Sequence, residues 1–359
     1  MSDHGSRKAD HLDLCSSDKV AFKQQTTLLE EVSLLHDALP EMAMNDVDLT
    51  TSLVGKTLSA PVVIAAMTGG IDRAATINRD LAQVAEALGF AFGFGSMRPL
   101  LDDPKALGYQ VRDVAPTATL FANLGIVQAR DASTADVARL VESTGCDAIC
   151  IHLNPAMEII QPNGDEDFRG GYDTLSRLIQ ELPCPVIAKE TGCGISRRVA
   201  KRLVEIGVEH VDVSGAGGTS WVGVETLRAR ARSQRLGELY WDWGVPTAAS
   251  VAQLTDLGLS IIATGGVQHG LDIARAVALG ATAGGMARPF LTAWNEGGLD
   301  AAMESGREVV DAIRVAHVLT GSRDIEALQA QPVLIGPSLA RWVPRDTTLA
   351  TRMQSVIAP

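Results

Sequence analysis

The stretch of sequence that decides the fold is Asp212-Val213-Ser214-Gly215-Ala216-Gly217-Gly218-Thr219-Ser220-Trp221. Residues 208–213 read as a buried strand, so the glycines come where a strand gives way to a loop. Glycine lets the main chain approach an anion closely, and hydroxyl side chains add donors. The loop therefore has the composition of a phosphate site, although one glycine cluster alone is better explained as a tight turn.

A second glycine cluster favours the phosphate interpretation. It reads Ile261-Ile262-Ala263-Thr264-Gly265-Gly266-Val267, again a strand-like run followed by glycines, and a helix-like segment covers residues 271–279. Two such strand ends lying side by side would form a phosphate cradle. In a (β/α)8 barrel this cradle is expected at the seventh and eighth strands.

The rest of the chain alternates between short apolar runs and helical segments. The other strand-like runs are residues 61–66, 90–94, 119–125, 148–154, 185–190 and 283–288. The helical segments are residues 77–88, 135–143, 172–182, 196–206, 248–257 and 299–319, with Ser196 as an N-cap. Eight buried strands alternating with helices predict an α/β fold, a (β/α)8 TIM barrel, in which the glycine stretch closes the sixth strand.

An open doubly wound sheet is the alternative fold. It would carry a G-x-G-x-x-G motif after the first strand, and Met67-Thr68-Gly69-Gly70 does not supply one. We predict three segments: an N-terminal extension of the same domain (1–60), the barrel (61–325) and a C-terminal tail (326–359). Within the extension, Leu34, Leu35, Leu39 and Met42 recur at roughly helical intervals, and the first fifteen residues resemble a mobile polar tail.

Composition narrows the classes of partner. The 359 residues are 46% hydrophobic and carry a formal net charge of -12, without a basic run that would suit a nucleic acid. Five cysteines show no metal-ligand spacing and suggest reduced thiols in a cytoplasmic protein. We find no signal peptide and no apolar run of membrane-spanning length, so we expect no membrane partner.

Polar residues gather where the predicted strands end, which is where a barrel of this type places its chemistry. They are Met67, Thr68, Ser96, Arg98, Asn123, His152, Asn154, Lys189, Glu190, Ser214, Thr264 and Arg288. Lys189 is the sharpest case, because a lysine at the end of a core strand is costly unless it meets an anion or an electron-rich partner. Asn123 offers the donor and acceptor needed to read a heterocycle. A phosphate cradle beside these groups suggests bound flavin mononucleotide (FMN).

At these residues the chain resembles type 2 isopentenyl-diphosphate isomerase, an FMN-dependent barrel enzyme. The matching motifs run along nearly the whole chain: Arg7-Lys8-x-Asp10-His11-Leu12, Asp48-Leu49-Thr50-Thr51, Met67-Thr68-Gly69-Gly70, Gly95-Ser96-x-Arg98, Ala122-Asn123-Leu124-Gly125, His152-Leu153-Asn154-Pro155, Asp165-x-Asp167-Phe168, Lys189-Glu190-x-Gly192-x-Gly194-x-Ser196, the Asp212–Trp221 stretch, Asp242-Trp243-Gly244-Val245-Pro246-Thr247, Gly265-Gly266 and Ala287-Arg288-Pro289. The blocks Lys189–Ser196 and Asp212–Trp221 are specific to this family, whereas Gly-Gly pairs occur in many flavin barrels.

The resemblance implies that isopentenyl diphosphate is converted to dimethylallyl diphosphate by a 1,3-allylic proton shift. Reduced FMN acts as the acid and base, NADPH is the expected reductant, and there is no net redox change. Mg²⁺, held by Glu158, binds the diphosphate. The family also implies a homotetramer or a larger homo-oligomer.

The resemblance also assigns site residues. FMN contacts fall on Met67, Thr68, Ser96, Asn123, Lys189, Ser214, Thr219, Gly265, Gly266, Ala287 and Arg288. Diphosphate contacts fall on Arg7, Lys8, His11, Arg98, His152 and Asn154, so the polar N-terminus becomes a lid that supplies cations. His152, Asn154 and position 157 form the catalytic set.

The chain departs from the family pattern at Met157. The family typically has Gln immediately before the Glu at position 158, and a thioether cannot donate a hydrogen bond. Asn163-Gly164 also stands where many members have Glu-Gly. Three explanations are open for Met157: the flavin does all the proton work, the pocket serves another prenyl or alkenyl substrate, or the residue is an engineered change.

Two hypotheses from other functional classes compete with the isomerase. A flavin oxidoreductase of a hydroxy acid would place a His and an Arg near the late strands, but Gly215-Ala216-Gly217-Gly218 follows Ser214 without a His. A flavin-binding protein that has lost catalysis is supported only by Met157, and the otherwise complete set of diphosphate residues argues against it.

Overall fold

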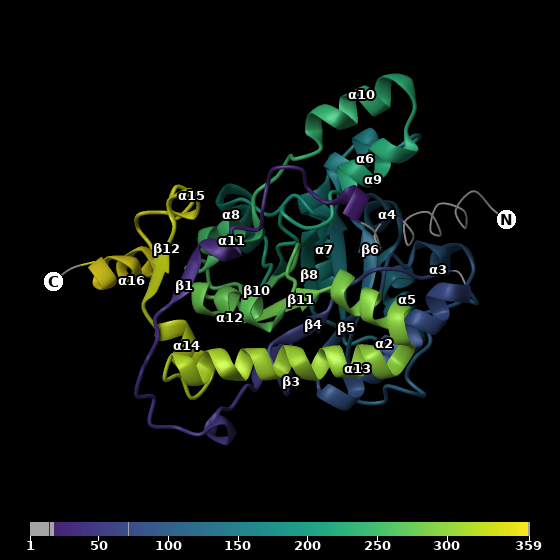
Figure 1. Ribbon diagram of the computed structural model, residues 1–359. Coiled ribbons are helices and arrows are strands. Elements are labelled where there is room, and N and C mark those ends of the chain that lie inside the picture. Colours follow the sequence, from purple (N-terminus) through teal and green to yellow (C-terminus); the bar gives the residue numbers. More distant parts are fainter. Residues whose placement is uncertain (1–13, 15–17, 71, 358–359) are drawn as a thin grey trace.

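A computed structural model describes residues 14, 18–70 and 72–357 of the chain (Figure 1). Eight parallel strands form a closed barrel in the order β10-β11-β4-β5-β6-β7-β8-β9. Their bounds are β4 (Val62–Ile64), β5 (Ala91–Gly93), β6 (Thr119–Gly125), β7 (Ala148–Leu153), β8 (Val186–Glu190), β9 (His210–Asp212), β10 (Ser260–Ala263) and β11 (Ala283–Met286). Because β11 also pairs with β4, the sheet closes on itself, which confirms the (β/α)8 barrel and excludes the open sheet.

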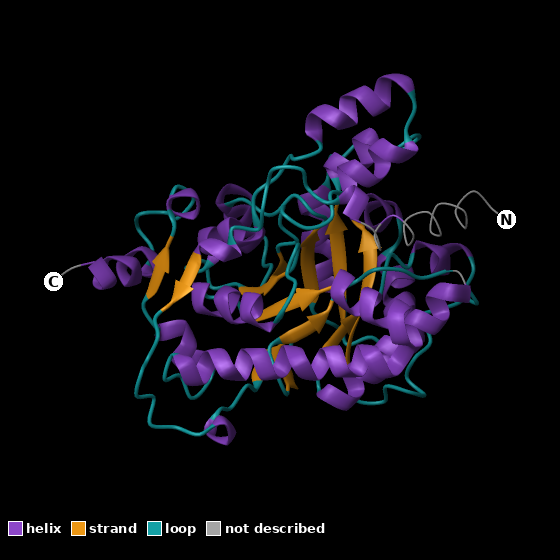
Figure 2. Ribbon diagram, in the orientation of Figure 1, coloured by secondary structure: helices purple, strands orange, loops and turns teal. Residues whose placement is uncertain are grey.

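Helices surround the barrel, as the ribbon coloured by secondary structure shows (Figure 2). They are α2 (Asp72–Leu88), α3 (Arg98–Asp102), α4 (Ile126–Asp131), α5 (Thr134–Thr144), α6 (Pro155–Ile160), α7 (Gly171–Glu181), α8 (Arg197–Glu205), α9 (Trp221–Arg228), α10 (Ala231–Tyr240), α11 (Thr247–Leu254), α12 (Gly270–Leu279), α13 (Arg288–Leu319), α14 (Ile325–Ala330), α15 (Pro337–Ala340) and α16 (Thr348–Ile357). The predicted N-cap is confirmed, because the Ser196 side chain accepts a hydrogen bond from the Val199 N–H.

A hairpin closes the amino-terminal end of the barrel. Strands β2 (Thr51–Leu53) and β3 (Lys56–Leu58) pair across Val54-Gly55, and both turn residues have positive φ angles. The buried side chains of Leu53, Val54 and Leu58 join an apolar cluster with residues from the beginnings of the barrel strands. With this end filled, the open end of the barrel lies at the carboxyl ends of the strands.

The helix-like spacing in residues 24–48 does not produce an α-helix. This segment holds two 3₁₀ turns, η2 (Leu29–Glu31) and η3 (Met44–Asp46), and the short strand β1 (Val32–Leu34). The prediction fails because the apolar residues do not share a buried face: Leu39 is 82% exposed, whereas Val32 is buried where β1 pairs with β12 (Val333–Ile335). Strand β12 comes from the C-terminal segment, so segments from the N-terminal and C-terminal extensions pair with each other beside the barrel (Figure 1).

The eighth strand is shorter than predicted, and the helix after it is longer. Strand β11 ends at Met286, and α13 already begins at Arg288 rather than near residue 299. Gly297 and Gly298 have non-helical backbone angles and kink this helix. The sequence shows the kink as a Gly-Gly pair, which explains why the segment before it did not read as helical.

Candidate functional site

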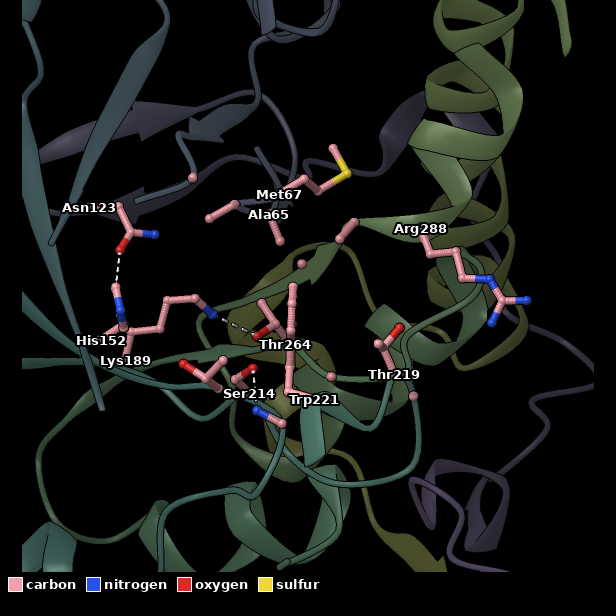
Figure 3. A pocket seen from close by; sticks show the side chains of 18 of the residues that line it. Ala65, Met67, Asn123, His152, Lys189, Ser214, Thr219, Trp221, Thr264 and Arg288 are labelled. Atoms are coloured by element: carbon pink, nitrogen blue, oxygen red, sulfur yellow. Dashed lines mark hydrogen bonds between the residues drawn. The ribbon is translucent and has the colours of Figure 1, made fainter. Parts of the chain in front are cut away.

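A cavity of about 250 Å³ opens at the carboxyl ends of the barrel strands (Figure 3). Its lining residues come from every barrel strand end and from the loops that follow. They are Ala65, Ala66, Met67, Thr68, Gly69, Gly95, Ser96, Arg98, Asn123, Gln128, His152, Asn154, Met157, Glu158, Lys189, Thr191, Gly192, Ser214, Gly218, Thr219, Trp221, Thr264, Gly265, Gly266, Val267, Gln268, Gly285, Ala287, Arg288, Pro289 and Leu291. A single water needs only about 15 Å³, so the space is that of a ligand.

One side of the cavity, which we call the glycine rim, consists of the loops at residues 214–219 and 264–267. The two loops touch backbone to backbone, because a Cβ atom added at Gly218 would lie 2.4 Å from the Gly266 nitrogen. A Cβ at Gly265 would lie 2.2 Å from the Gly215 carbonyl oxygen. Only glycine permits this approach. The rim follows the sixth and seventh barrel strands, β9 and β10, and the ends of the seventh and eighth strands line the cavity as well.

The glycine rim presents backbone donors to the cavity. Within residues 18–70 and 72–357, the N–H groups of Gly218, Thr219 and Gly266 have no hydrogen-bond acceptor. Ser214 adds a hydroxyl and holds a positive φ of 36°, a strained conformation for a non-glycine residue. Its oxygens accept hydrogen bonds from the Gly192 N–H, which ties the rim to the neighbouring loop. Such a concave set of free N–H groups suits an anion.

The opposite side, which we call the side-chain wall, is built from strands β6, β7 and β8. Lys189 is buried, and its Nζ lies 2.7 Å from Asp212 Oδ2. Asp212 Oδ1 accepts hydrogen bonds from the Thr264 hydroxyl and from the Ser214 N–H. The buried charge of Lys189 is therefore compensated by the Asp212 carboxylate, which lies behind the cavity wall.

His152 lies beside Lys189 on the side-chain wall and bonds to Asn123. The His152 Nδ1 is 2.7 Å from Asn123 Oδ1, and Asn123 Nδ2 donates to the Phe94 carbonyl at 2.9 Å. Strand pairing places His152 directly opposite Lys189. Burial of the ring, together with the Lys189 charge, lowers the His152 pKa to about 4, so the ring is neutral at pH 7.

Glu158 lies where the side-chain wall meets helix α6, and both of its oxygens are bonded. Asn154 Nδ2 donates to Oε1 at 2.8 Å, and the Asp165 N–H donates to Oε2 at 3.0 Å. Among the described residues, no three His, Cys, Asp or Glu side chains come together as a metal site. A cation at Glu158 would therefore need further ligand atoms from water or from a ligand.

The structure brings the predicted residues together. All eleven positions assigned to FMN line the cavity, as do Arg98, His152, Asn154, Met157 and Glu158. Arg7, Lys8 and His11 lie outside the described residues. Glu190 is an exception among the polar strand ends: its carboxylate turns away and accepts hydrogen bonds from the N–H groups of residues 191, 193 and 194. Burial raises the Glu190 pKa to about 8, against the opposing effect of these donors.

Sequence reasoning missed three contributors. Asp212, the partner of Lys189, reads as part of the strand that precedes the glycines. Gln128 lies one turn into α4 and carries no local signal. Trp221 belongs to the quoted stretch, and its ring extends toward the cavity centre from the start of α9 (Figure 3). Residues buried behind a cavity, or reaching into it from a helix, leave no pattern of their own.

The fold and the site define a class of enzyme, the FMN-dependent barrels. The family described as FMN-dependent dehydrogenase matches residues 4–163 and 156–334. A solved structure of a mandelate oxidase mutant with a monooxide FMN adduct superimposes with a TM-score of 0.65, covering 91% of this chain and 95% of its own. At 20% identity this likeness shows a shared fold.

Closer relatives refine the class. An isopentenyl-diphosphate delta-isomerase of Methanosarcina acetivorans is 43% identical over 335 residues, covering 92% of this chain and 91% of its own. One from a Nostoc species is 42% identical over 330 residues, covering 90% and 94%. The chain belongs to the type 2 isopentenyl-diphosphate delta-isomerase family and is an isomerase. None of the helices in residues 18–70 and 72–357 combines the length and hydropathy that crossing a bilayer requires.

Proposed function

We propose that the protein converts isopentenyl diphosphate to dimethylallyl diphosphate by a 1,3-allylic proton shift, with FMN in the cavity and Mg²⁺ at Glu158. The observation that carries the proposal is one continuous cavity with free backbone donors on one side and polar side chains on the other. The names of the relatives supply the substrate. NADPH as reductant, a homotetramer or larger assembly and a cytoplasmic location remain part of the proposal. Cys146, Cys150, Cys184 and Cys193, which are free thiols, support a reducing compartment.

The cavity fits a flavin mononucleotide in its donor chemistry. The glycine rim, with the hydroxyls of Ser214 and Thr219, would hold the phosphate. Lys189 and Asn123 on the side-chain wall would contact the ring system, with Met67, Thr68 and Ser96 along a third edge. Reduced FMN, when bound, supplies an electron-rich ring and an ionisable nitrogen next to the alkene. The side chains of this protein orient the alkene and exclude water.

The diphosphate end of the substrate would lie at Arg98, Asn154 and His152, near Glu158. Arg98 begins helix α3 at the exposed edge of the cavity, where it can meet an entering anion. Glu158 is already fixed by Asn154 and by the Asp165 N–H, so its carboxylate is oriented before a cation arrives. Mg²⁺ commonly uses one carboxylate, several waters and phosphate oxygens. Arg7, Lys8 and His11 would add cations from the N-terminus.

The apolar part of the cavity would enclose the alkenyl tail. Met157 is 9% exposed and lines the cavity without a polar group. The resemblance to the family places a Gln typically at this position. The Met157 thioether can neither donate nor relay a proton, so this side chain packs against the substrate and takes no part in the proton shift. An apolar lining of this kind would also suit another prenyl or alkenyl substrate. The assay therefore includes such substrates.

The test is an anaerobic incubation of the FMN-loaded protein with NADPH, Mg²⁺ and isopentenyl diphosphate, with the products separated by chromatography. We expect dimethylallyl diphosphate to form, and we expect chelation of Mg²⁺ to stop it. Absence of product, with turnover of a longer alkenyl diphosphate instead, would shift the substrate assignment. Stoichiometric flavin reduction by a hydroxy acid would replace the isomerase with an oxidoreductase.

A further inference from the structure

The hydrogen bonds around His152 determine which of its nitrogens carries the proton. Asn123 Nδ2 donates to the Phe94 carbonyl, and a carbonyl can only accept. The amide of Asn123 is therefore oriented with Oδ1 toward His152 Nδ1, at 2.7 Å. Since an amide oxygen also only accepts, Nδ1 must carry the hydrogen. In the neutral ring this leaves Nε2 unprotonated, as a hydrogen-bond acceptor.

The surroundings of the ring disfavour a second proton. The charged group facing it is the Lys189 ammonium on β8, directly opposite in the strand register. Strand β6 presents the neutral Asn123, and helix α4 presents the neutral Gln128. A buried ring beside a like charge loses more by protonation than it gains. His152 is thus an acceptor at Nε2 rather than a cation for the diphosphate.

Gln128 adds a second acceptor beside Nε2. Its Nε2 group donates to Asp165 Oδ2 at 3.1 Å, which turns Oε1 toward Gly125. A Cβ atom added at Gly125 would lie 2.1 Å from Gln128 Oε1 and 3.0 Å from His152 Nε2. The two acceptors therefore border the same space over a glycine, and both residues line the cavity. A single hydrogen-bond donor in this space could be bound by both Gln128 Oε1 and His152 Nε2.

We propose that Asn123 is a positioning residue that fixes His152 as the Nδ1–H tautomer, so that His152 Nε2 and Gln128 Oε1 bind an O–H donor at the bound diphosphate. This inference rests on the proposed function, because it specifies how that substrate is recognised. The donor is either a protonated phosphate oxygen or a water held by Mg²⁺. Both offer the same O–H group, and the experiment separates them.

The tautomer is tested first, without flavin, Mg²⁺ or substrate. Nitrogen NMR of the full-length protein labelled with ¹⁵N-histidine, at neutral pH, should show His152 with a protonated Nδ1 and a bare Nε2. His317 is an internal reference, because its Nδ1 lies 2.9 Å from the Ile313 carbonyl in α13. A protonated Nε2 on His152, alone or together with Nδ1, would overturn the proposal.

The role of Asn123 is tested with two variants. In Asn123→Leu the His152 signals should change from one tautomer to a mixture, while those of His317 stay unchanged. Asn123→Asp keeps an oxygen that accepts from Nδ1–H, so the single tautomer should return. An unchanged single tautomer in Asn123→Leu would show that another group fixes the ring. If Asn123→Leu does not fold, the contrast between Asn123→Asp and the parent protein decides, because a carboxylate partner must also raise the pH at which His152 titrates.

The acceptor pair is tested with isopentenyl diphosphate added to protein that holds oxidised FMN, which prevents turnover. The His152 Nε2 signal should shift on binding. A shift that needs Mg²⁺ identifies metal-bound water as the donor, and a shift without Mg²⁺ identifies a protonated phosphate oxygen. Phosphorus NMR reports binding independently. Bound diphosphate without a change at Nε2 would refute the acceptor pair alone, whereas an unbound diphosphate would refute the proposed function and the pair together.

A matched pair of variants tests Gln128. Gln128→Leu removes the acceptor, and we expect isopentenyl diphosphate to bind roughly threefold to tenfold more weakly, the usual cost of one hydrogen bond. Gln128→Glu keeps an acceptor oxygen and should retain more of the affinity. Equal affinity in Gln128→Leu and the parent protein would remove Gln128 from the pair.

Discussion

The two sides of the cavity recognise ligands by different means. The glycine rim uses main-chain N–H groups, and its side chains matter mainly by being absent. The side-chain wall uses Lys189, Asn123 and His152. Asp212 and the Phe94 carbonyl, which lie outside the predicted site, hold Lys189 and Asn123, and Asn123 in turn holds His152. Adding a Cβ atom at the rim should therefore abolish FMN binding. Removing a partner from the wall should lower the unfolding free energy.

The largest effect is expected at the glycine rim. In Gly218→Ala the new Cβ would lie 2.4 Å from the Gly266 nitrogen, and backbone cannot move aside as a flexible side chain can. The two loops must separate, so we expect the purified protein to retain little or no FMN, measured by absorbance after denaturation. Gly171→Ala is the matched control, because its nearest contact, Ile126 at 3.5 Å, is an ordinary one. Equal flavin content in both variants would show that the rim does not hold the phosphate.

The next effect concerns the buried pair on the side-chain wall. Asp212→Asn leaves the Lys189 ammonium without its carboxylate, and breaking a buried pair typically costs about 3–5 kcal/mol of unfolding free energy. Lys189→Ala should in addition weaken flavin retention. Urea denaturation measures the first effect and flavin content the second.

An exposed ion pair serves as the control for this comparison. Arg79 and Asp113 lie 2.6 Å apart with side chains 45% and 61% exposed, so solvent screens the pair and Arg79→Gln should lower the unfolding free energy far less than Asp212→Asn. A similar loss of unfolding free energy in Asp212→Asn and Arg79→Gln would mean that burial does not strengthen the Lys189–Asp212 ion pair.

Because His152 is neutral in the folded protein, the unfolding free energy should depend on pH. The His152 pKa is about 4 in the folded protein and 6.5 in the unfolded chain, so the unfolded state takes up more protons between these values. Stability should therefore be fully present above pH 6.5 and fall as the pH drops toward 4, by on the order of 3 kcal/mol from this residue. Urea denaturation at several pH values measures the slope.

His152→Gln is the matched variant for this prediction. It should flatten the pH dependence without abolishing it, because burial also lowers the pKa of His210 and of His317. An unchanged slope in His152→Gln would place the source of the acid sensitivity elsewhere in the fold.

The smallest effect is expected at Met157. Met157→Gln introduces a side chain that can donate and accept hydrogen bonds. It should raise isomerase turnover if the lack of such a group at position 157 limits the rate. Met157→Leu is the control of similar volume without hydrogen-bonding capacity, and it should leave the rate near that of the parent. A lower rate in Met157→Gln would mean that the pocket has adapted to methionine.

The same contrast explains what could be predicted from the sequence. The barrel and the rim have local signatures, since Val62–Ile64 and Gly217-Gly218 can each be recognised from their immediate neighbours. Pairs are different: nothing next to Lys189 points to Asp212, and nothing next to Gln128 points to Asp165. The helical pattern predicted within residues 24–48 was wrong for a related reason. Val32 lies in a strand because it pairs with Ile335, near the other end of the chain.

The glycine rim also depends on the beginning of the chain. The Phe22 N–H donates to the Gly218 carbonyl, the Ser220 N–H donates to the Val20 carbonyl, and the Lys23 N–H reaches a carboxylate 219 residues further along, at Asp242. A ribosome releases this early segment long before it makes the loops on which it docks. The anion-binding end of the cavity can therefore be completed only after most of the chain has emerged, and the appearance of bound yellow coenzyme during synthesis would report a nearly finished molecule.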